Sequence, residues 1–183
     1  VLIYGESGTG KELIARAVHE TSPFSEGNFV ALNCSSIPAE LFEGELFGHR
    51  DGAFTGAKRG GRKGLIEEAQ DGVLFLDEIS ELALDQQSKL LRFLQERYYR
   101  PIGSNEEKLA YLKVVAASNK ELKQLVVEGK FRADLFFRIN VFNIHIPPLR
   151  ERPEDISSIA MQKLTRFVSS YQSQFSVADI LSE

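Results

Sequence analysis

A glycine-rich turn between an apolar strand and an amphipathic helix constrains the fold of this chain most strongly. Residues 1–5 (VLIYG) have the near-continuous apolar composition of a strand buried on both faces, and GESGTGKE overlaps its end. In such a turn, backbone N–H groups point toward a bound anion, and the following helix adds the positive end of its dipole. The spacing G-x-x-x-x-G-K places Lys11 within reach of the outer phosphates of a nucleotide. The sequence therefore predicts a nucleotide-phosphate site near its start.

The residues of this predicted site extend into the first turn of the helix. They are Gly5, Glu6, Ser7, Gly8, Thr9, Gly10, Lys11, Glu12 and Leu13. Glu12 stands where a Ser or Thr hydroxyl commonly binds magnesium. The alternative is an ordinary strand–turn–helix that contains three glycines, but the buried strand before the turn and the amphipathic helix after it favour a phosphate site.

Four further apolar runs have the composition of strands. They cover residues 29–33, 73–78, 112–119 and 141–147. Helical patterns lie between them, including SKLLRFLQER with three leucines at helical spacing. This alternation predicts an α/β fold: a three-layer sandwich with a central parallel sheet of five strands.

Polar side chains end several of these strands. The run VLFLDE ends on Asp77 and Glu78, where the aspartate can hold Mg²⁺, directly or through a water, and the glutamate can activate a water for attack on phosphate. Taken alone, the pair could equally mark the exit of a strand to solvent. Asn33 and Asn119 end two other strands, and the carboxyl ends of parallel strands share one edge. We therefore expect all four side chains to converge on the phosphate loop.

The segment GAFTGA, residues 52–57, interrupts this pattern. Its small residues favour neither a core nor a stable helix, and the surrounding stretch 45–64 reads as an inserted loop. Glycines permit sharp turns at a displayed tip, Phe54 offers a rigid apolar anchor, and Thr55 offers a hydroxyl. From these residues alone, a disordered surface loop is the simpler interpretation. Basic residues surround the motif, namely Arg50, Lys58, Arg59, Arg62 and Lys63.

The pattern changes after Pro147 and Pro148. A helix with Pro153 near its start is predicted to carry one apolar stripe, and this begins a smaller appended subdomain. The stripe consists of Ile156, Ile159, Leu164, Phe167 and Val168. With the boundary near residues 149–152, we expect a nucleotide-binding part over residues 1–149 and an incomplete helical part over residues 150–183.

Composition excludes several classes of protein. The chain of 183 residues is 43% hydrophobic and 26% charged, as in a soluble globular domain, and it has no apolar run long enough to span a bilayer. A single cysteine, Cys34, excludes an internal disulfide and favours a reducing compartment. The net charge of -4 argues against a protein that coats nucleic acid generally, although a local basic patch remains compatible with it.

The chain resembles the central AAA+ ATPase domain of bacterial sigma-54-dependent transcription activators, the enhancer-binding proteins. The resemblance extends from residue 1 to about residue 171, and GAFTGA is highly specific to this family. The matching stretches are GESGTGKELIARAVHE, FVALNCSSIPAELFEGELFGHRDGAFTGA, GVLFLDEI, GKFRADLFFRINVF and PPLRERPEDI. The family carries Lys followed by Glu in its phosphate loop, so Glu12 matches it.

The resemblance implies a cytoplasmic bacterial ATPase that uses ATP and Mg²⁺, forms a hexameric ring and remodels sigma-54 RNA polymerase. The sigma-54 contact would be the loop tip, Gly52, Ala53, Phe54, Thr55, Gly56 and Ala57. The basic residues around the tip could face promoter DNA or acidic polymerase surfaces, and a solvated charge run is at least as compatible with them. Sequence-specific DNA binding in the family belongs to a separate C-terminal domain that is absent from this sequence.

The resemblance also implies roles for two arginines and for Asn33. Arg132 and Arg138 would reach into the nucleotide site of the neighbouring subunit, completing a catalytic set of Asp77, Glu78, Asn119, Arg132, Arg138 and Asn33. The local alternative is an ion pair between Asp134 and Arg138, which have helical spacing. Residues six apart do not share a helix face, so both arginines can serve one phosphate only if Arg132 precedes the helix. Asn33 would exchange contact with Glu78 when the γ-phosphate is lost.

Two other functions stay open, another AAA+ remodeller and a nucleotide-gated oligomerisation module. Both ends of the sequence look cut. The family's helical lid normally continues to a GNxRE-type stretch that does not occur here, and the residues that usually contact adenine precede the first strand. We therefore expect residues 1–183 alone to bind nucleotide weakly and to hydrolyse it slowly or not at all.

Overall fold

The structure, a computed structural model, describes residues 1–53 and 60–170. Its contacts divide the chain into two compact units, Val1–Ile146 and Pro147–Glu183, and each is described here by itself. Phe54, Thr55, Gly56 and Ala57, together with Lys58 and Arg59, lie outside the described residues. Within the described ranges, no helix has the length and apolar character needed to cross a membrane.

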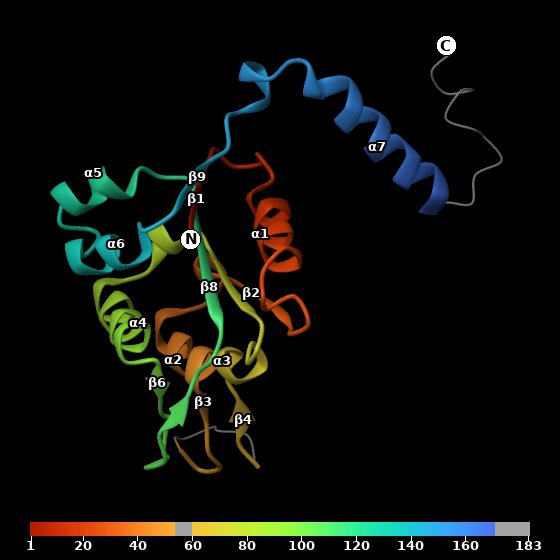
Figure 1. Cartoon of the computed structure of the whole chain (residues 1–183). Coiled ribbons are helices and arrows are strands. Elements are labelled where there is room, and N and C mark those ends of the chain that lie inside the picture. Colours follow the sequence, from red (N-terminus) through yellow and green to blue (C-terminus); the bar gives the residue numbers. More distant parts are fainter. Residues whose placement is uncertain (54–59, 171–183) are drawn as a thin grey trace. The chain divides into compact units, whose positions relative to one another are not determined.

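A parallel sheet of five strands forms the centre of the first unit (Figure 1). In spatial order its strands are β2 (Phe29–Asn33), β5 (Val73–Asp77), β8 (Lys113–Ser118), β1 (Leu2–Tyr4) and β9 (Asn143–His145). Every neighbouring pair is parallel. The predicted fold class is confirmed, and each strand lies within the apolar run that predicted it.

Helices cover both faces of this sheet, as the three-layer prediction requires. They are α1 (Lys11–Glu20), α2 (Ala39–Phe47), α3 (Leu65–Glu68), α4 (Leu84–Glu96), α5 (Leu122–Val127) and α6 (Ala133–Ile139), with short 3-10 turns at η1 (Cys34–Ser36) and η2 (Ile79–Glu81). Figure 1 shows α1 on one face and α2, α4, α5 and α6 on the other.

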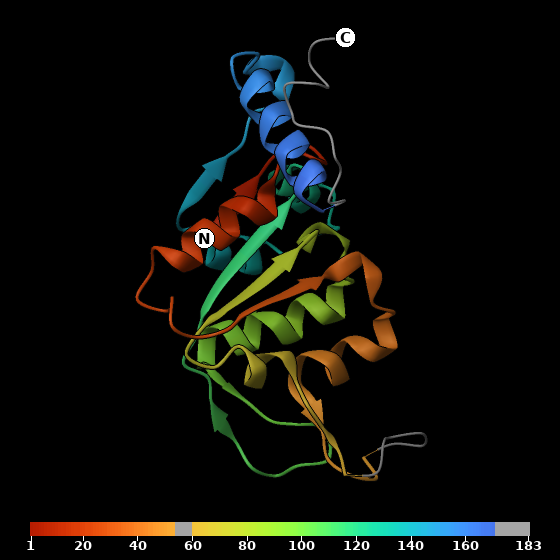
Figure 2. The same ribbon diagram turned by 90° about the vertical axis from the view of Figure 1, so that its right-hand side faces the viewer.

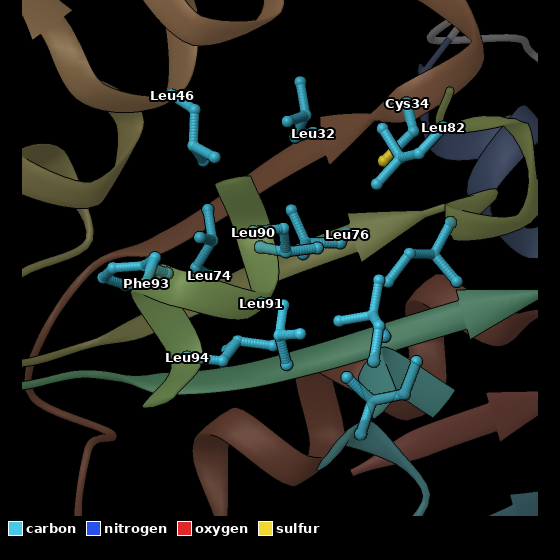
Figure 3. Close-up of a cluster of buried hydrophobic side chains, with 14 of the residues drawn as sticks. Leu32, Cys34, Leu46, Leu74, Leu76, Leu82, Leu90, Leu91, Phe93 and Leu94 are labelled. Atoms are coloured by element: carbon cyan, nitrogen blue, oxygen red, sulfur yellow. The ribbon is translucent and has the colours of Figure 1, made fainter. Parts of the chain in front are cut away.

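Strand β5 contributes side chains to both cores because they alternate between the faces of the sheet. Val73 and Phe75 pack with Ala15 of α1 in the smaller cluster. Leu74 and Leu76 pack with the leucines of α4 in the larger one, which Figure 3 shows in close-up. These four side chains of β5 are at most 1% exposed, which explains why a strand covered on both faces lacks polar alternation.

Two short hairpins project from the end of the sheet opposite the carboxyl ends of its strands (Figure 2). The first pairs β3 (Gly48–His49) with β4 (Arg62–Lys63) and carries the GAFTGA segment between them. The second pairs β6 (Tyr98–Tyr99) with β7 (Lys108–Leu109) and was not predicted from the sequence.

The inserted loop is shorter than the stretch 45–64 predicted for it, and part of that stretch does build core. Helix α2 continues to Phe47, and Leu46 and Phe47 are 0% and 8% exposed within the larger core cluster. The physical reason is that Phe42 and Leu46 are four residues apart, so both lie on the buried face of one helix.

The second unit contains η3 (Leu149–Glu151) and α7 (Asp155–Ser170). The helix forms where Pro153 and the apolar stripe predict it. Of that stripe, Ile156 and Phe167 remain 47% and 56% exposed, whereas Ile159 and Leu164 are half-buried. The two units divide just before Pro147 and Pro148, where the sequence pattern changes.

Candidate functional site

The glycine-rich loop joins β1 to α1 at the carboxyl edge of the sheet. Gly8 and Gly10 adopt left-handed φ angles of 81° and 94°, which side chains larger than glycine rarely adopt. Gly10 is the N-cap of α1, and no side chain of a described residue caps that end. The first backbone N–H groups of a ten-residue helix therefore face the loop, as an anion site requires.

Lys11 is folded into the loop that precedes it. Its side chain is buried, and its Nζ donates hydrogen bonds to the carbonyl oxygens of Gly5 at 2.9 Å and Glu6 at 3.0 Å. Thr9 closes the same turn by donating from Oγ1 to Glu6 O at 2.8 Å. The ammonium group therefore lies against the concave side of the loop, where a phosphate held by backbone N–H groups would meet a positive charge.

The acidic strand end lies two strands away along the same edge. Asp77 is the last residue of β5, and its Oδ1 accepts a hydrogen bond from the backbone N–H of Glu78 at 2.9 Å. Glu78 has a left-handed φ of 52°, an uncommon conformation for a residue with a side chain. Strained backbone of this kind often occurs at functional sites.

The two asparagines lie on the strands that flank β5. Asn33 ends β2 and is the register partner of Asp77. Asn119 follows Ser118, the last residue of β8, whose carbonyl oxygen accepts a hydrogen bond from Gly5 N at 3.3 Å. The edge thus presents, in spatial order, Asn33, the acidic pair, Asn119 and the phosphate loop.

Burial and nearby carboxylates control the chemistry of Cys34, the residue after Asn33. Its thiol is 4% exposed, and burial, followed by the charges of Asp77 and Glu78, raises its pKa to about 12. Asp77 is the register partner of Asn33, so its carboxylate lies beside the end of β2.

The two arginines, Arg132 and Arg138, have different partners. Arg132 is the N-cap of α6 with extended backbone, so it precedes the helix, as simultaneous service of one phosphate would require. Its guanidinium pairs with Asp134 at 2.7 Å, and this bond raises the pKa of Arg132. Arg138 donates from Nη2 to the carbonyl oxygen of Leu94 at 2.7 Å. The ion pair weighed as the local alternative therefore has a different geometry, because Asp134 pairs with Arg132 and not with Arg138.

The second hairpin packs directly against the base of the GAFTGA hairpin. Arg50 N donates to Ile102 O at 3.0 Å, and Ile102 N donates to Gly48 O at 2.9 Å. The Cβ of Ala53 lies so close to Gly103 that a Cβ at Gly103 would be 3.0 Å from it. Sequence reasoning missed this contact because two-residue strands have no measurable period, although Gly103 was an available turn signal.

The described basic residues near the motif all have acidic partners. Arg50 pairs with Glu106 at 2.8 Å, Lys63 pairs with Glu67 at 3.5 Å, and Arg62 pairs with Glu45. Glu67 also accepts a hydrogen bond from Lys108 of the second hairpin at 2.8 Å. These exposed ion pairs link the two hairpins to each other and to α2 and α3, and each contributes at most about 1 kcal/mol.

The parallel five-stranded sheet, the glycine-rich loop with Lys11 and the acidic end of β5 define an AAA+ ATPase domain. The crystal structure of NtrX from Brucella abortus in complex with ATP is similar, with a TM-score of 0.82, 34% sequence identity and coverage of 91% of this chain and 37% of that one.

The sequence identifies the family within this class. The Sigma-54 interaction domain family matches residues 1–145, and this chain belongs to it. Regulatory protein AtoC from Escherichia coli is 52% identical over 172 residues, which are 94% of this chain and 37% of AtoC. A Nif-specific regulatory protein from Azospirillum brasilense is 50% identical over 167 residues, 91% of this chain and 27% of that protein. The chain thus spans about a third of the length of such relatives.

Proposed function

We propose that this chain is the ATP-hydrolysing part of a ring-shaped motor that remodels sigma-54 RNA polymerase and thereby activates transcription. One observation carries the proposal. Helix α2 begins shortly after Asn33 at the phosphate edge and ends at Phe47, directly before the hairpin that bears GAFTGA. Because a helix is stiff, a displacement at one end of it is transmitted to the other.

The residues at the sheet edge divide the hydrolytic chemistry among them. The loop amides and Lys11 bind the β- and γ-phosphates, and Glu78 accepts a proton from the attacking water. Asn119, beside the loop, donates from its amide to the γ-phosphate or the attacking water. Leu13, which is 62% exposed on the first turn of α1, offers an apolar surface to the nucleotide.

Asp77 is the residue proposed to hold Mg²⁺. Among the described residues, no group of three or more His, Cys, Asp or Glu side chains could bind a metal by itself. That fits magnesium, which typically binds one or two carboxylates together with substrate phosphates. When bound, Mg²⁺ neutralises charge that develops on the phosphate oxygens.

A ring follows from the proposed role of Arg132 and Arg138. Both side chains are exposed on the side of α6, so a neighbouring subunit can approach them. Guanidinium groups suit bidentate contact with phosphate, and head-to-tail contacts of this kind close into a ring when the rotation permits. We propose a hexamer in which each subunit offers its two arginines to the next nucleotide site.

Asn33 is proposed to report the state of the γ-phosphate to the hairpin. Its amide lies beside Asp77, and it starts the connection through η1 to α2. An exchange of its contact with Glu78 would move α2 and, through it, the GAFTGA hairpin. Gly52 to Ala57, with Phe54 at the tip, would then contact sigma-54, with promoter DNA nearby. Residues 150–183 are proposed to begin a helical lid, and sequence-specific DNA recognition is assigned to a domain outside this sequence.

Replacement of Phe54 by Ala tests the motor. In the natural full-length protein, F54A is expected to abolish open-complex formation at a sigma-54 promoter while ATP hydrolysis continues. The hairpin that carries the GAFTGA motif projects from the end of the sheet opposite the phosphate edge (Figure 2). Leu109→Ala, an exposed apolar residue of the second hairpin, is the matched control. Full transcription by F54A would favour a different AAA+ remodeller.

The third candidate, a nucleotide-gated oligomerisation module, makes a different prediction for Glu78. It requires nucleotide binding but no hydrolysis, so Glu78→Ala should leave its function unchanged. The motor predicts that this variant binds ATP, stays trapped in that state and fails to open promoters. Hydrolysis and promoter opening measured on the same preparation decide between the two.

A further inference from the structure

The side chain of Gln87, in the first turns of α4, is completely buried and fully hydrogen-bonded. Its exposure is 0%. Its Nε2 donates to Leu82 O at 2.8 Å and to Lys130 O at 3.0 Å, and its Oε1 accepts from Arg132 N at 2.8 Å. Two carbonyl oxygens on one side and an N–H on the other fix the orientation of the amide, because the reverse orientation would place like groups together.

Together these three bonds connect the start of α4 and the segment just before it to a turn that lies far away in the chain. Leu82 follows η2, which begins directly after Glu78, so one bond is made to the chain that leaves the acidic edge. Lys130 and Arg132 belong to the turn before α6, 43 and 45 residues from Gln87. The amide of Gln87 therefore ties the acidic edge of a subunit to the arginine that we propose it offers to its neighbour.

The turn that carries Arg132 is held from its other side by α5. Lys130 N and Phe131 N both donate to Leu125 O, which anchors the turn to α5, and Phe131 is buried. Arg132 is the first residue after these anchors, and the partner of its guanidinium in the described part of the chain is Asp134, two residues further on. As the N-cap of α6, Arg132 has its N–H outside the hydrogen bonds of the helix, so Gln87 supplies the acceptor that fixes its backbone.

We infer that Gln87 is a positioning residue for Arg132, and that it couples the acidic edge of one subunit to the arginine presented to the next subunit's nucleotide. The inference rests on the proposed function, because it requires Arg132 to act on the neighbouring site. It assigns no contact between Gln87 and the nucleotide. A buried amide that satisfies three backbone groups at once holds their spacing more firmly than a solvent-exposed bond would.

Gln87→Met tests the inference, because it keeps the length of the side chain and removes all three bonds. In the natural full-length protein, we expect binding of a non-hydrolysable ATP analogue to be unchanged. The kcat of ATP hydrolysis should fall by about tenfold to a hundredfold, since a misplaced arginine finger loses part of its effect on the transition state. Gln86→Met is the matched control: Gln86 is also buried, but its Oε1 accepts from the N–H of Ala83, the N-cap of α4, and among the described residues it has no bond to the turn before α6.

Mixing Q87M with a variant that cannot hydrolyse ATP separates positioning from simple damage. A Q87M subunit keeps an intact nucleotide site and presents a poorly placed Arg132, whereas a Glu78→Gln subunit presents a good Arg132 and cannot hydrolyse. In mixed rings the Q87M site receives the arginine of its Glu78→Gln neighbour, so hydrolysis should recover. A Q87M subunit that was damaged as a whole would not be rescued.

A parallel mixture of Arg132→Ala with Glu78→Gln keeps the two hypotheses distinguishable. If Arg132→Ala lowers hydrolysis and is rescued in this mixture, the action of Arg132 on the neighbour holds. Failure of rescue for Q87M would then overturn only the role of Gln87. If Arg132→Ala has no effect or is not rescued, the action of Arg132 on the neighbour fails first, and the inference for Gln87 fails with it.

Gln87→Glu is the second variant, and it covers the case in which Q87M unfolds. It keeps an acceptor for Arg132 N, and the buried carboxyl group, protonated there, keeps one O–H donor in place of the two N–H donors to Leu82 and Lys130. If both variants fold, we expect Gln87→Glu to retain more ATP hydrolysis than Q87M. If Q87M does not fold, we expect Gln87→Glu still to hydrolyse ATP at a measurable rate. A loss as large as that of Arg132→Ala, despite the acceptor that remains for Arg132 N, would overturn Gln87 as the residue that positions Arg132.

Discussion

Asn33 and Asp77 are register partners at the carboxyl ends of two adjacent parallel strands, so an amide and a carboxylate lie side by side at the sheet edge. The amide oxygen of Asn33 already accepts hydrogen bonds from Ser35 N at 2.9 Å and from Ser35 Oγ at 2.8 Å. The NH₂ group is therefore the part of Asn33 that remains for the acidic residues or for a phosphate.

Asn33→Asp removes that donor and keeps the acceptor for Ser35. It also places a second carboxylate beside Asp77, where like charges oppose full ionisation. We expect the number of open promoter complexes formed per ATP hydrolysed to fall, because the proposed signal from the γ-phosphate is lost. Ser36→Ala, which removes only a bond to the Asn33 carbonyl oxygen, is the control. An unchanged ratio would argue against Asn33 as the transmitting residue.

Lys11→Ala should prevent tight binding of ATP. The Lys11 ammonium lies against the loop carbonyl oxygens of Gly5 and Glu6, so its removal leaves the concave side without a positive charge. A charge-assisted bond of this kind contributes about 1.5–3 kcal/mol, which corresponds to roughly a tenfold to hundredfold rise in Kd. Calorimetric titration with a non-hydrolysable analogue measures it, and Lys123→Ala on α5 is the control. Equal affinity in both variants would contradict the phosphate site.

Gly48→Ala should destabilise the domain more than Gly129→Ala does. Both glycines have positive φ angles, 78° and 70°, so both variants carry a backbone penalty of about 1–3 kcal/mol. The ψ of 177° at Gly48 belongs to a region that essentially only glycine adopts, which places its penalty at the upper end. A Cβ at Gly48 would also lie 2.5 Å from Gly64 N, whereas a Cβ at Gly129 meets nothing within 4 Å. The added overlap should cost about 1–3 kcal/mol more.

Urea unfolding at neutral pH measures the difference between the two glycine variants. Similar losses of unfolding free energy would show that the base of the hairpin yields to the added methyl group.

Glu67 should make the free energy of unfolding depend on pH. The hydrogen bond from Lys108, the largest cause, lowers the pKa of Glu67. A lowered pKa in the folded state contributes stability above the ordinary glutamate pKa of about 4.3, and this contribution is lost as the pH falls through the folded pKa. Glu67→Gln should therefore lower the free energy of unfolding by about 0.5–1 kcal/mol at pH 7, and by almost nothing at a pH below the pKa of Glu67 in the folded state.

Urea unfolding measures this from pH 7 down to a pH below the folded pKa of Glu67. It compares wild type with Glu67→Gln and with Glu68→Gln, a variant of the exposed neighbouring residue. A difference between wild type and Glu67→Gln that does not shrink with acid would show that Glu67 acts through packing and not through its charge.

The thiol of Cys34 should react with disulfide reagents much more slowly in the folded chain than in the unfolded chain. Burial and the charges of Asp77 and Glu78 raise its pKa to about 12, so little thiolate exists at pH 8. Reaction with a chromogenic disulfide, with and without urea, measures the ratio. Reaction as fast in the folded chain as in urea would place Cys34 at the surface and away from the two acids.

Local patterns in the sequence were sufficient for the strands and the phosphate loop. Residues 73–76 are apolar throughout because β5 is covered on both faces, and this composition is readable without any partner. The loop before Lys11 needs glycine where φ is positive, which is also a local requirement. The convergence of Asn33, Asp77 and Asn119 followed from one general property of parallel sheets.

Contacts between distant segments required the tertiary structure. No local pattern indicated that Ile102 would bond to the base of the GAFTGA hairpin, or that Asp134 would pair with Arg132 and leave Arg138 to Leu94. Two partners of Gln87, Lys130 and Arg132, lie 43 and 45 residues away, and glutamine is a residue type that is mostly exposed. The sequence by itself determined the strands, the loop and the residues at the sheet edge, because backbone preference and hydrophobic period act between near neighbours. Only the tertiary structure decided which side chains hold the arginines and the two hairpins, because those contacts depend on how separate helices and hairpins pack.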